Sequence, residues 1–224
     1  MDRPLYTGFA WAYDLVVPSP GGPAPAEVAR LMAGRRRIVD AGCGTGRHAA
    51  ALAQAGFHMT GIDISEPLLE IARARAPEVD FALADIRSWQ PADPFDGALC
   101  RGVLNDLLDD ADRQAALDNL ARMLRAGGLL VLDVRELAGT HTRYKREPIT
   151  TRSAEGVFFR SETQMVADLM VISETISSQD AHADYEFRMR PWTAAELDER
   201  AAAAGFAHVE RRLEGDRIVA ACFR

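Results

Sequence analysis

Hydrophobic residues are spaced along this chain in two different ways. Between residues 37 and 135, short apolar runs alternate with stretches in which apolar residues recur at helical spacing. Apolar and polar residues then alternate one by one over three later segments, 156–163, 167–177 and 181–190. The first pattern predicts buried parallel strands joined by helices, and the second predicts an antiparallel meander with one buried face.

Glycine, proline and capping residues set the expected bounds of the elements. The strands of the first part are expected at 38–41, 58–63, 79–85, 95–102 and 129–135, and the helices between them at 47–56, 67–76 and 112–124. A Pro/Gly loop at 18–25 and a short helix at 26–33 are expected before the first strand. Thr193 and Glu196 form a capping box that opens another helix, and a hairpin of strands 207–213 and 217–223 ends the chain.

The first strand leads directly into a turn with three glycines. The sequence Asp40-Ala-Gly-Cys-Gly-Thr-Gly46 places a glycine at every second position, just before the first crossover helix. Glycine lets the backbone approach a ligand where a Cβ would clash, and the first N–H groups of the helix stay free to face that ligand. The next strand ends in Asp63, whose carboxylate could accept two hydrogen bonds from a ribose cis-diol. Together these features predict a nucleoside site, and tight turns without a ligand are the structural alternative.

The spacing of this turn argues against a dinucleotide. A dehydrogenase fingerprint has glycine or alanine at the sixth position from the first glycine, but that position here is Arg47. An arginine suits neither close packing of helix on strand nor a turn built for pyrophosphate. A different nucleoside ligand is therefore favoured.

With the acid before the first glycine and the segment Gly61-Ile-Asp-Ile-Ser65, the chain resembles the class I S-adenosylmethionine-dependent methyltransferases. The resemblance implies S-adenosyl-L-methionine as cofactor and S-adenosyl-L-homocysteine as product. It also implies a doubly wound, mostly parallel sheet of seven strands in the order 3-2-1-4-5-7-6, with the last strand antiparallel. The antiparallel segments after the fifth strand are then a β insert, and the terminal hairpin further disfavours a dehydrogenase.

The same resemblance implies residue roles around the cofactor. Asp40 and the glycine turn are expected near the methionine moiety, Asp63 at the ribose, and Asp85 with the Ile86 backbone at the adenine. The complete set of expected cofactor contacts is Tyr13, Asp40, Ala41, Gly42, Gly44, Gly46, Asp63, Ile64, Asp85, Ile86 and Arg101.

Candidates for contact with a substrate follow the ends of the later strands. Asn105 lies in a loop that mixes apolar and polar residues after the fourth strand, and Arg135 ends the fifth. Residues 141–146 are expected to form a basic loop, more suited to solvent than to a ligand, although a carboxylate substrate would suit it. His141 and His182 fall in the region expected over the pocket, whereas His48 is interpreted as structural. No catalytic pair and no metal site is predicted.

The whole chain, 1–224, is expected to form one domain. Residues 1–33 would supply a lid over the cofactor, because the aromatic segment 6–14 precedes the first strand; a terminal helix that merely packs its rings on the domain is the alternative. Residues 148–190 would form the β insert, which covers the mouth of the site or makes a homodimer contact.

The composition limits the classes of substrate and the cellular location that are expected. A formal net charge of −7 disfavours a nucleic-acid substrate, so small neutral or cationic molecules are expected. The three cysteines are far apart and sit beside apolar strand residues, as in reduced, buried thiols. No signal peptide or membrane span is recognised, and a cytoplasmic protein is expected.

The function that these features predict is methyl transfer from S-adenosylmethionine to a nitrogen or oxygen nucleophile on a small molecule. The sequence does not choose among amine, hydroxyl and carboxylate acceptors. An NAD-dependent oxidoreductase and a non-catalytic S-adenosylmethionine-binding protein are the alternatives.

Overall fold

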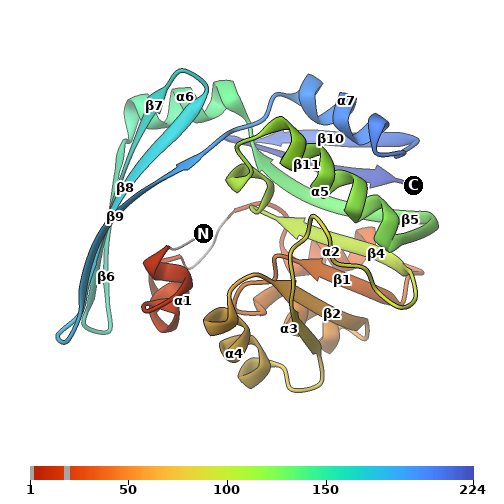
Figure 1. The fold of residues 1–224 in the computed structure, drawn as a ribbon, viewed down its shortest axis with the longest axis horizontal. Helices are drawn as coiled ribbons and strands as arrows, with labels where there is room; N and C mark the ends of the chain where they lie inside the picture. The colour runs from red at the N-terminus through yellow and green to blue at the C-terminus, as the bar shows by residue number, and fades with distance from the viewer. Residues whose placement is uncertain (1–2, 18–20) are drawn as a thin grey trace.

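The structure is a computed structural model that describes residues 3–17 and 21–224. It contains two separate sheets, a seven-stranded sheet in the order β10-β11-β5-β4-β1-β2-β3 and a four-stranded sheet in the order β6-β7-β8-β9. Figure 1 shows the four-stranded sheet standing to one side of the larger sheet, with the N-terminal segment between them. Numbered along the chain, the strands of the larger sheet lie in the order 3-2-1-4-5-7-6, which confirms the predicted fold.

The seven-stranded sheet is parallel except at the pairings of β11. Its strands are β1 (Arg37–Ala41), β2 (His58–Asp63), β3 (Asp80–Leu83), β4 (Phe95–Arg101), β5 (Leu124–Arg135), β10 (His208–Glu214) and β11 (Arg217–Phe223). Strand β11 pairs antiparallel with both β5 and β10. The carboxyl ends of the parallel strands therefore meet at one edge, where ligands bind in sheets of this type.

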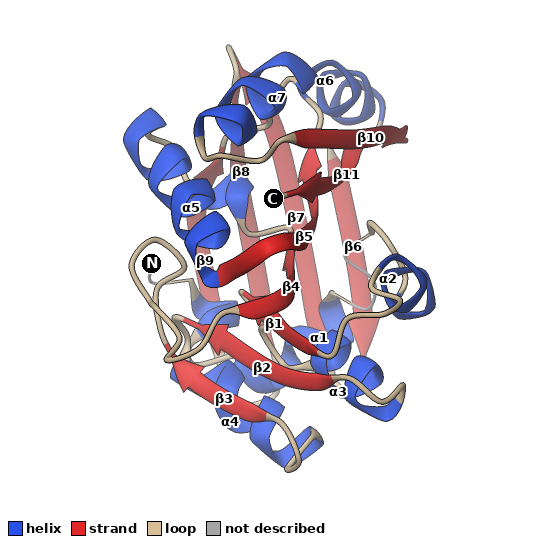
Figure 2. Ribbon diagram, turned by 90° about the vertical axis from the view of Figure 1, so that its right-hand side faces the viewer, coloured by secondary structure: helices blue, strands red, loops and turns tan. Residues whose placement is uncertain are grey.

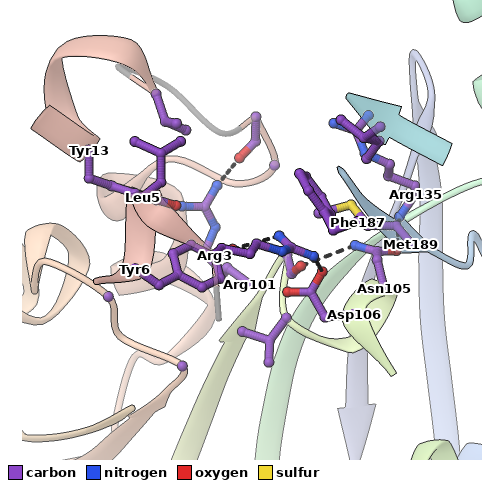
Figure 3. Close-up of a pocket in the computed structure, with 18 of the residues that line it drawn as sticks. Arg3, Leu5, Tyr6, Tyr13, Arg101, Asn105, Asp106, Arg135, Phe187 and Met189 are labelled. Atoms are coloured by element: carbon purple, nitrogen blue, oxygen red, sulfur yellow. Dashed lines mark hydrogen bonds and ion pairs between the residues drawn. The ribbon is translucent and has the colours of Figure 1, made fainter. Parts of the chain in front are cut away.

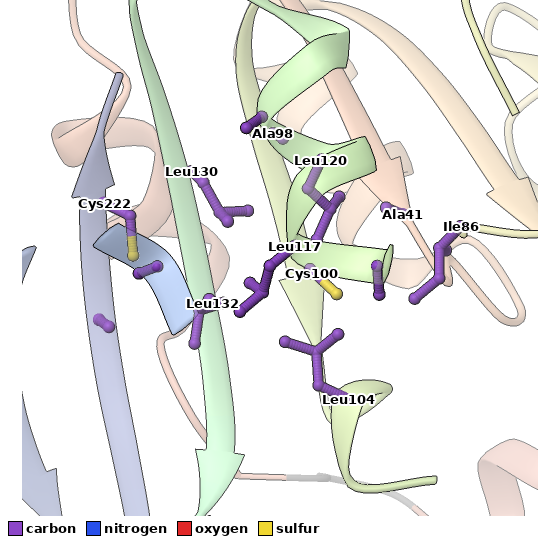
Figure 4. Packing of buried hydrophobic residues seen from close by; sticks show 14 of the residues in the cluster. Ala41, Ile86, Ala98, Cys100, Leu104, Leu117, Leu120, Leu130, Leu132 and Cys222 are labelled. Atoms are coloured by element: carbon purple, nitrogen blue, oxygen red, sulfur yellow. The ribbon is translucent and has the colours of Figure 1, made fainter. Parts of the chain in front are cut away.

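Helices cover both faces of the larger sheet, which explains why its strands are apolar on both sides. On one face α2 (Pro25–Leu31) and α3 (Arg47–Gln54) bury Val28 and Leu52 in a core with Ile38, while α4 (Glu66–Arg75) packs beside β3. On the other face α5 (Asp110–Met123) and α7 (Ala194–Ala203) form a second core. Figure 4 shows Leu117 and Leu120 of α5 beside Cys100 of β4 in that core.

The four-stranded sheet is a simple antiparallel meander. Its strands are β6 (Ile149–Ala154), β7 (Val157–Val166), β8 (Leu169–Ser177) and β9 (His182–Met189), and its long strands are clear in Figure 2. The sequence predicted only the last three. Strand β6 was missed because it is a largely exposed edge strand without apolar alternation.

The N-terminal segment packs against this second sheet. It consists of two 3₁₀ turns, η1 (Pro4–Tyr6) and η2 (Ala10–Ala12), and the short helix α1 (Tyr13–Val16), rather than the single helix considered for residues 6–14. A third core joins the two parts and contains Leu5, Phe9, Ala12 and Val16 from the segment and Val157, Phe159 and Ile176 from the sheet. Residues 18–20 of the predicted Pro/Gly loop and residues 1–2 of the predicted lid lie outside the described part of the chain.

Several expected boundaries are wrong, among them the start of the fifth strand, because β5 begins at Leu124 and not at residue 129. Residues 141–146, expected as a loop, belong to helix α6 (Leu137–Arg146), whose first turn is capped by the Glu136 side chain and whose last turn carries cations that favour a helix C-terminus. Helix α5 begins at Asp110, after the N-cap residue Asp109, and not at the expected residue Asp112.

All three cysteines are free and buried, as expected. Within the described ranges, no helix is both long and apolar enough to cross a membrane.

Candidate functional site

A cavity of about 740 Å³ lies between the carboxyl edge of the larger sheet, the N-terminal segment and one face of the second sheet. Its volume falls within the range of roughly 300–1,000 Å³ that is typical of small-molecule sites. Figure 3 shows part of this cavity, with Tyr6 and Tyr13 from the N-terminal segment on one side and Phe187 and Met189 of β9 on the other. Residues far apart in sequence thus enclose one space.

The glycine turn after β1 is packed closely at both ends and open in the middle. All three glycines have positive φ, at 81° for Gly42, 53° for Gly44 and 74° for Gly46. A Cβ at Gly42 would lie 2.1 Å from a methyl of Val103, and one at Gly46 would lie 2.9 Å from the Cβ of Ala72. A Cβ at Gly44 would meet nothing within 4 Å, and Gly44 lines the cavity. The turn therefore presents bare backbone to a ligand at Gly44.

Asp63 fixes this turn from the end of β2. One carboxylate oxygen accepts the Gly44 N–H at 2.8 Å, and the other accepts the Ser65 N–H at 2.9 Å. Burial raises the pKa of the carboxyl, and the two backbone donors oppose that rise. A carboxylate has about four acceptor positions, so Asp63 can hold the turn and still accept hydroxyl groups from the cavity.

Asp40 is the buried acid at the end of β1, and it also lines the cavity. Burial raises its pKa to about 7, although Arg101 and the Ala49 N–H, which donates to it, oppose the rise. Of the other residues expected around the turn, Ala41 and Gly46 support it from behind and are not part of the lining.

The acid expected at the adenine already has a partner. Asp85 accepts hydrogen bonds from the backbone N–H and the guanidinium of Arg87, which holds the pKa of the carboxyl below its ordinary value. Arg87 also pairs with Asp112 at 2.7 Å. Asp85, Ile86 and Ile64 all line the cavity, and Ile64 is exposed to it. The two isoleucines offer an apolar surface for a flat ring, beside a carboxylate that is shared with Arg87.

Arg101, at the end of β4, is held by several groups. Its guanidinium contacts Nε2 of His48 at 2.6 Å, donates to the Gly21 carbonyl and lies 3.3 Å from Asp133. Burial and the positive charges of Arg101 and Arg47 lower the pKa of His48 to about 4, so its ring is neutral near pH 7. Sequence reasoning treated His48 as purely structural, yet it lines the cavity beside Arg101.

Asn105 lines the cavity but is engaged by the backbone. Its Oδ1 accepts the Arg135 N–H at 2.8 Å, and its Nδ2 donates to the Gly102 carbonyl at 3.2 Å. The side chain therefore ties the loop after β4 to the end of β5. Asn105 was expected to contact the substrate, and these two hydrogen bonds indicate that it positions the loop.

A charged pair that the sequence did not reveal joins the N-terminus to this loop. Arg3 donates to Asp106 at 2.7 Å, and the Arg3 guanidinium lies 3.5 Å from the centre of the Phe187 ring (Figure 3). Burial raises the pKa of Asp106, and Arg3 opposes that rise. Because the pair is largely buried, it holds the N-terminal segment over the cavity.

One face of the second sheet forms the opposite wall. Alternate residues of β7, β8 and β9 point to the same side, including Phe159, Ile172 and Phe187. Among these apolar residues stands Glu174, which accepts hydrogen bonds from Ser161 at 3.2 Å and from the Tyr185 hydroxyl. Burial raises the pKa of Glu174. The alternation predicted a buried face, but only the docking of the sheet shows that this face meets the cavity.

Of the three remaining residues expected to contact a substrate, one lines the cavity and two do not. Arg135 lines the cavity and pairs with Asp216 at 2.5 Å. The expectation that His141 and His182 face the pocket is wrong, because neither is part of its lining. Helix α6 turns His141 toward the Ala167 carbonyl in a separate surface hollow, and His182 begins β9 in an exposed position beside Asp184. Across residues 3–17 and 21–224, no group of three or more His, Cys, Asp or Glu side chains could hold a metal ion.

Comparison with known proteins places this geometry in context. Residues 38–128 match a family model described as a methyltransferase domain. The chain is 32% identical to trans-aconitate 2-methyltransferase of Delftia acidovorans over 154 residues. This alignment covers 67% of this chain and 57% of that protein. The chain spans about half the length of the curated relatives it matches.

Two solved structures share the fold over nearly the full chain. Streptomyces venezuelae DesVI superposes with a TM-score of 0.81 at 20% identity and covers 96% of this chain and 97% of its own. CalS10, an S-adenosylmethionine-bound amino pentose methyltransferase from Micromonospora echinaspora, has a TM-score of 0.70 at 22% identity, and the match covers 100% of both chains.

Proposed function

We propose that the chain is a class I S-adenosylmethionine-dependent methyltransferase that methylates a small molecule, a proposal supported by its fold and by the match of residues 38–128 to a methyltransferase domain. An acceptor nitrogen or oxygen would attack the methyl carbon in line, and the bond from that carbon to the sulfonium sulfur would break to release S-adenosylhomocysteine. One observation carries the proposal: the open glycine turn, the Asp63 carboxylate and the wall of the second sheet enclose a single cavity. Its volume has room for a nucleoside cofactor and a small acceptor together.

The residues around the turn fit S-adenosylmethionine. The open position at Gly44 admits a ligand against the backbone, and Asp63 keeps free lone pairs for the ribose hydroxyls. Asp40 and Gly42 would lie along the methionine moiety, where a carboxylate suits a cationic group. Ile64, Asp85 and Ile86 would meet the adenine, and Tyr13 and Arg101 would complete the lining.

The cofactor supplies an activated methyl group on a sulfonium, which is a good leaving group. The protein then has to align the acceptor and exclude water, and positioning of this kind can be equivalent to an effective molarity of ~10⁵ M or more. The N-terminal segment and the second sheet carry out that exclusion in this proposal, because they enclose the cavity together with the carboxyl edge of the larger sheet. The segment at 1–33 would thus act as a lid, clamped by Arg3 and Asp106.

A base is needed only for acceptors that hold their proton at neutral pH, such as hydroxyl groups. Glu174 is the carboxyl of the second sheet that lines the cavity, and burial raises its pKa toward the range in which a base works well. It would accept the proton of a hydroxyl acceptor, whereas a neutral amine would need only to be placed.

Cofactor binding tests the first part of the proposal. Calorimetric titration of the full chain should show binding of S-adenosylmethionine and S-adenosylhomocysteine but not of NAD. In Asp63→Ala the affinity should fall by about 10- to 100-fold, as expected for lost hydrogen bonds to a charged group. Asp80→Ala is the matched control, because Asp80 is exposed on the neighbouring strand β3 and is not part of the lining.

Turnover on a panel of amines, alcohols and carboxylates, followed as S-adenosylhomocysteine release, tests the second part. Binding of NAD instead would favour the oxidoreductase, and unchanged affinity in Asp63→Ala would contradict the assigned role of Asp63. Tight S-adenosylmethionine binding without transfer to any acceptor would favour the non-catalytic binding protein.

The predicted homodimer remains part of the proposal. The outer face of the second sheet exposes Ile149, Phe158 and Val166, which a partner chain could cover. Sedimentation equilibrium of the full chain and of Phe158→Glu would test it, because a dimer through this face should dissociate in the variant. A monomer at all concentrations would exclude this contact.

A further inference from the structure

Charge is divided along the carboxyl edge of the larger sheet. The strand registers place Asp63, Asp40, Arg101 and Arg135 on the same face of neighbouring strands, with Arg217 of β11 directly opposite Arg135. Acids thus occupy the end at β1 and β2, and arginines occupy the end at β4, β5 and β11. All five residues line the cavity.

The arginines at this end outnumber their acidic partners. Asp133 is shared by Arg101 and Arg217, at 3.3 Å from Arg101, so one carboxylate serves two guanidinium groups. Asp216 is likewise shared by Arg135 at 2.5 Å and Arg143 at 3.0 Å. Two carboxylates therefore face four arginines, which leaves an excess of two positive charges.

A fifth arginine enters from the second sheet. Arg152 of β6 lines the cavity and makes no ion pair or hydrogen bond through its side chain with any residue in the described ranges. Glu214 also lines the cavity, and it shares Arg212 with Glu27 on the outer surface, so it counts against the excess. The five arginines still outnumber Asp133, Asp216 and Glu214, so these residues together carry excess positive charge, in a chain whose overall charge is −7.

Such a cluster is unfavourable without a counter-charge. Like charges directly opposite each other on paired strands destabilise a sheet. Arg135 of β5 and Arg217 of β11 form such a pair, so their repulsion is unfavourable without a counter-charge. Burial adds to this cost: it lowers the pKa of Arg135, because a buried guanidinium loses hydration. An oxyanion would relieve both costs, because arginine binds carboxylate and phosphate groups through two parallel N–H donors.

We propose that Arg135, Arg143, Arg152 and Arg217 form an oxyanion subsite, and that the methyl acceptor carries a carboxylate or phosphate group. This inference rests on the proposed function, because the subsite shares one cavity with the cofactor residues. It replaces the expectation of neutral or cationic substrates, which came from the net charge of the whole chain. The anionic group anchors the acceptor at β5 and β11, away from the acids at β1 and β2.

The test measures binding of simple oxyanions to the full chain saturated with S-adenosylhomocysteine. Calorimetric titrations with inorganic phosphate, pyrophosphate and succinate distinguish a phosphoryl group from a carboxylate as the preferred ligand. At least one of these probes should bind, and added salt should weaken its binding. In Arg152→Gln and in Arg143→Gln, the affinity for that probe should fall about tenfold, as expected for one charged hydrogen bond.

Arg146→Gln is the matched control, because Arg146 is exposed on the same helix as Arg143 and does not line the cavity. Arg152→Gln breaks no pair within the described residues, so its effect does not depend on a change in folding. Unchanged oxyanion affinity in both lining variants, or no binding of any probe, would overturn the subsite. If S-adenosylhomocysteine itself fails to bind, the proposed function fails first, so the two results are distinguishable.

Discussion

Asp40 offers the sharpest test of the electrostatics of the site. The Asp40→Asn substitution keeps the size of the side chain and an oxygen that can accept the Ala49 N–H. It removes the ability to ionise and replaces one carboxyl oxygen with an NH2 donor. Asp40 is buried, at 3% exposed, and because the two side chains have nearly the same volume, little change in packing is expected.

The magnitude follows from the pKa. Burial raises the pKa of Asp40 from 3.8 to about 7, so between these values the folded state holds a proton that the unfolded state has lost. Stability from this group is present below pH 4 and is lost as the pH rises through 7. A shift of about three units corresponds to roughly 4 kcal/mol in the free energy of unfolding. His48 acts in the opposite sense, since its pKa is lowered to about 4 and its contribution is lost as the pH falls below 6.5.

The assay is denaturant unfolding of both proteins at several pH values from 4 to 8, without cofactor. The His48 contribution is common to both proteins and largely cancels in the difference. The stability of Asp40→Asn relative to the wild type should therefore rise with pH by up to roughly 4 kcal/mol and level off above pH 7. A difference that stays constant with pH would refute the inference that Asp40 is protonated in the folded protein near neutrality.

Three further predictions follow from neighbouring contacts. The affinity for S-adenosylmethionine should rise with pH from 5 to 8 in the wild type, as Asp40 ionises near a cationic ligand, but calorimetry should show no such rise in Asp40→Asn. Gly42→Ala should lower the free energy of unfolding by about 1–3 kcal/mol more than Gly34→Ala does in denaturant unfolding; both positions have φ near 80°, but only the Gly42 Cβ would clash, with Val103. Asp106→Ala should cost about 3–5 kcal/mol, because it leaves Arg3 buried without its partner. Limited proteolysis should then cut the N-terminal segment faster than in Asp109→Ala, and equal cleavage rates would count against the clamp.

The core of the fold could be predicted because its signals are local. The glycine turn follows the apolar run at 38–41 directly, and Asp63 ends the next strand, one crossover helix later. Right-handed parallel crossovers then leave few arrangements of the strands. That Asp40, Gly44 and Asp63 line one cavity could be expected for the same reason, since all three lie at or just after the ends of predicted strands.

The acceptor side depended on contacts between distant parts of the chain. The alternation along β8 shows that Glu174 shares a face with Ile172, but not that this face meets the ends of β4 and β5. The Arg3–Asp106 pair joins residues 103 positions apart, and no local pattern marks it. His141 was misplaced because the loop expected at 141–146 is part of a helix, which fixes the direction of the side chain.

The two walls of the cavity come from separate stretches of the chain, with the glycine turn and Asp63 in one and strands β6–β9 in the other. Residues on the inner face of β6–β9 can therefore be exchanged without disturbing the hydrogen bonds between Asp63 and the turn. In the proposed enzyme, substitutions in the meander alone would therefore change which molecule is modified, while the donor of the transferred group stays the same. Grafting a meander from another protein of this fold onto the present frame is a direct route to altered selectivity.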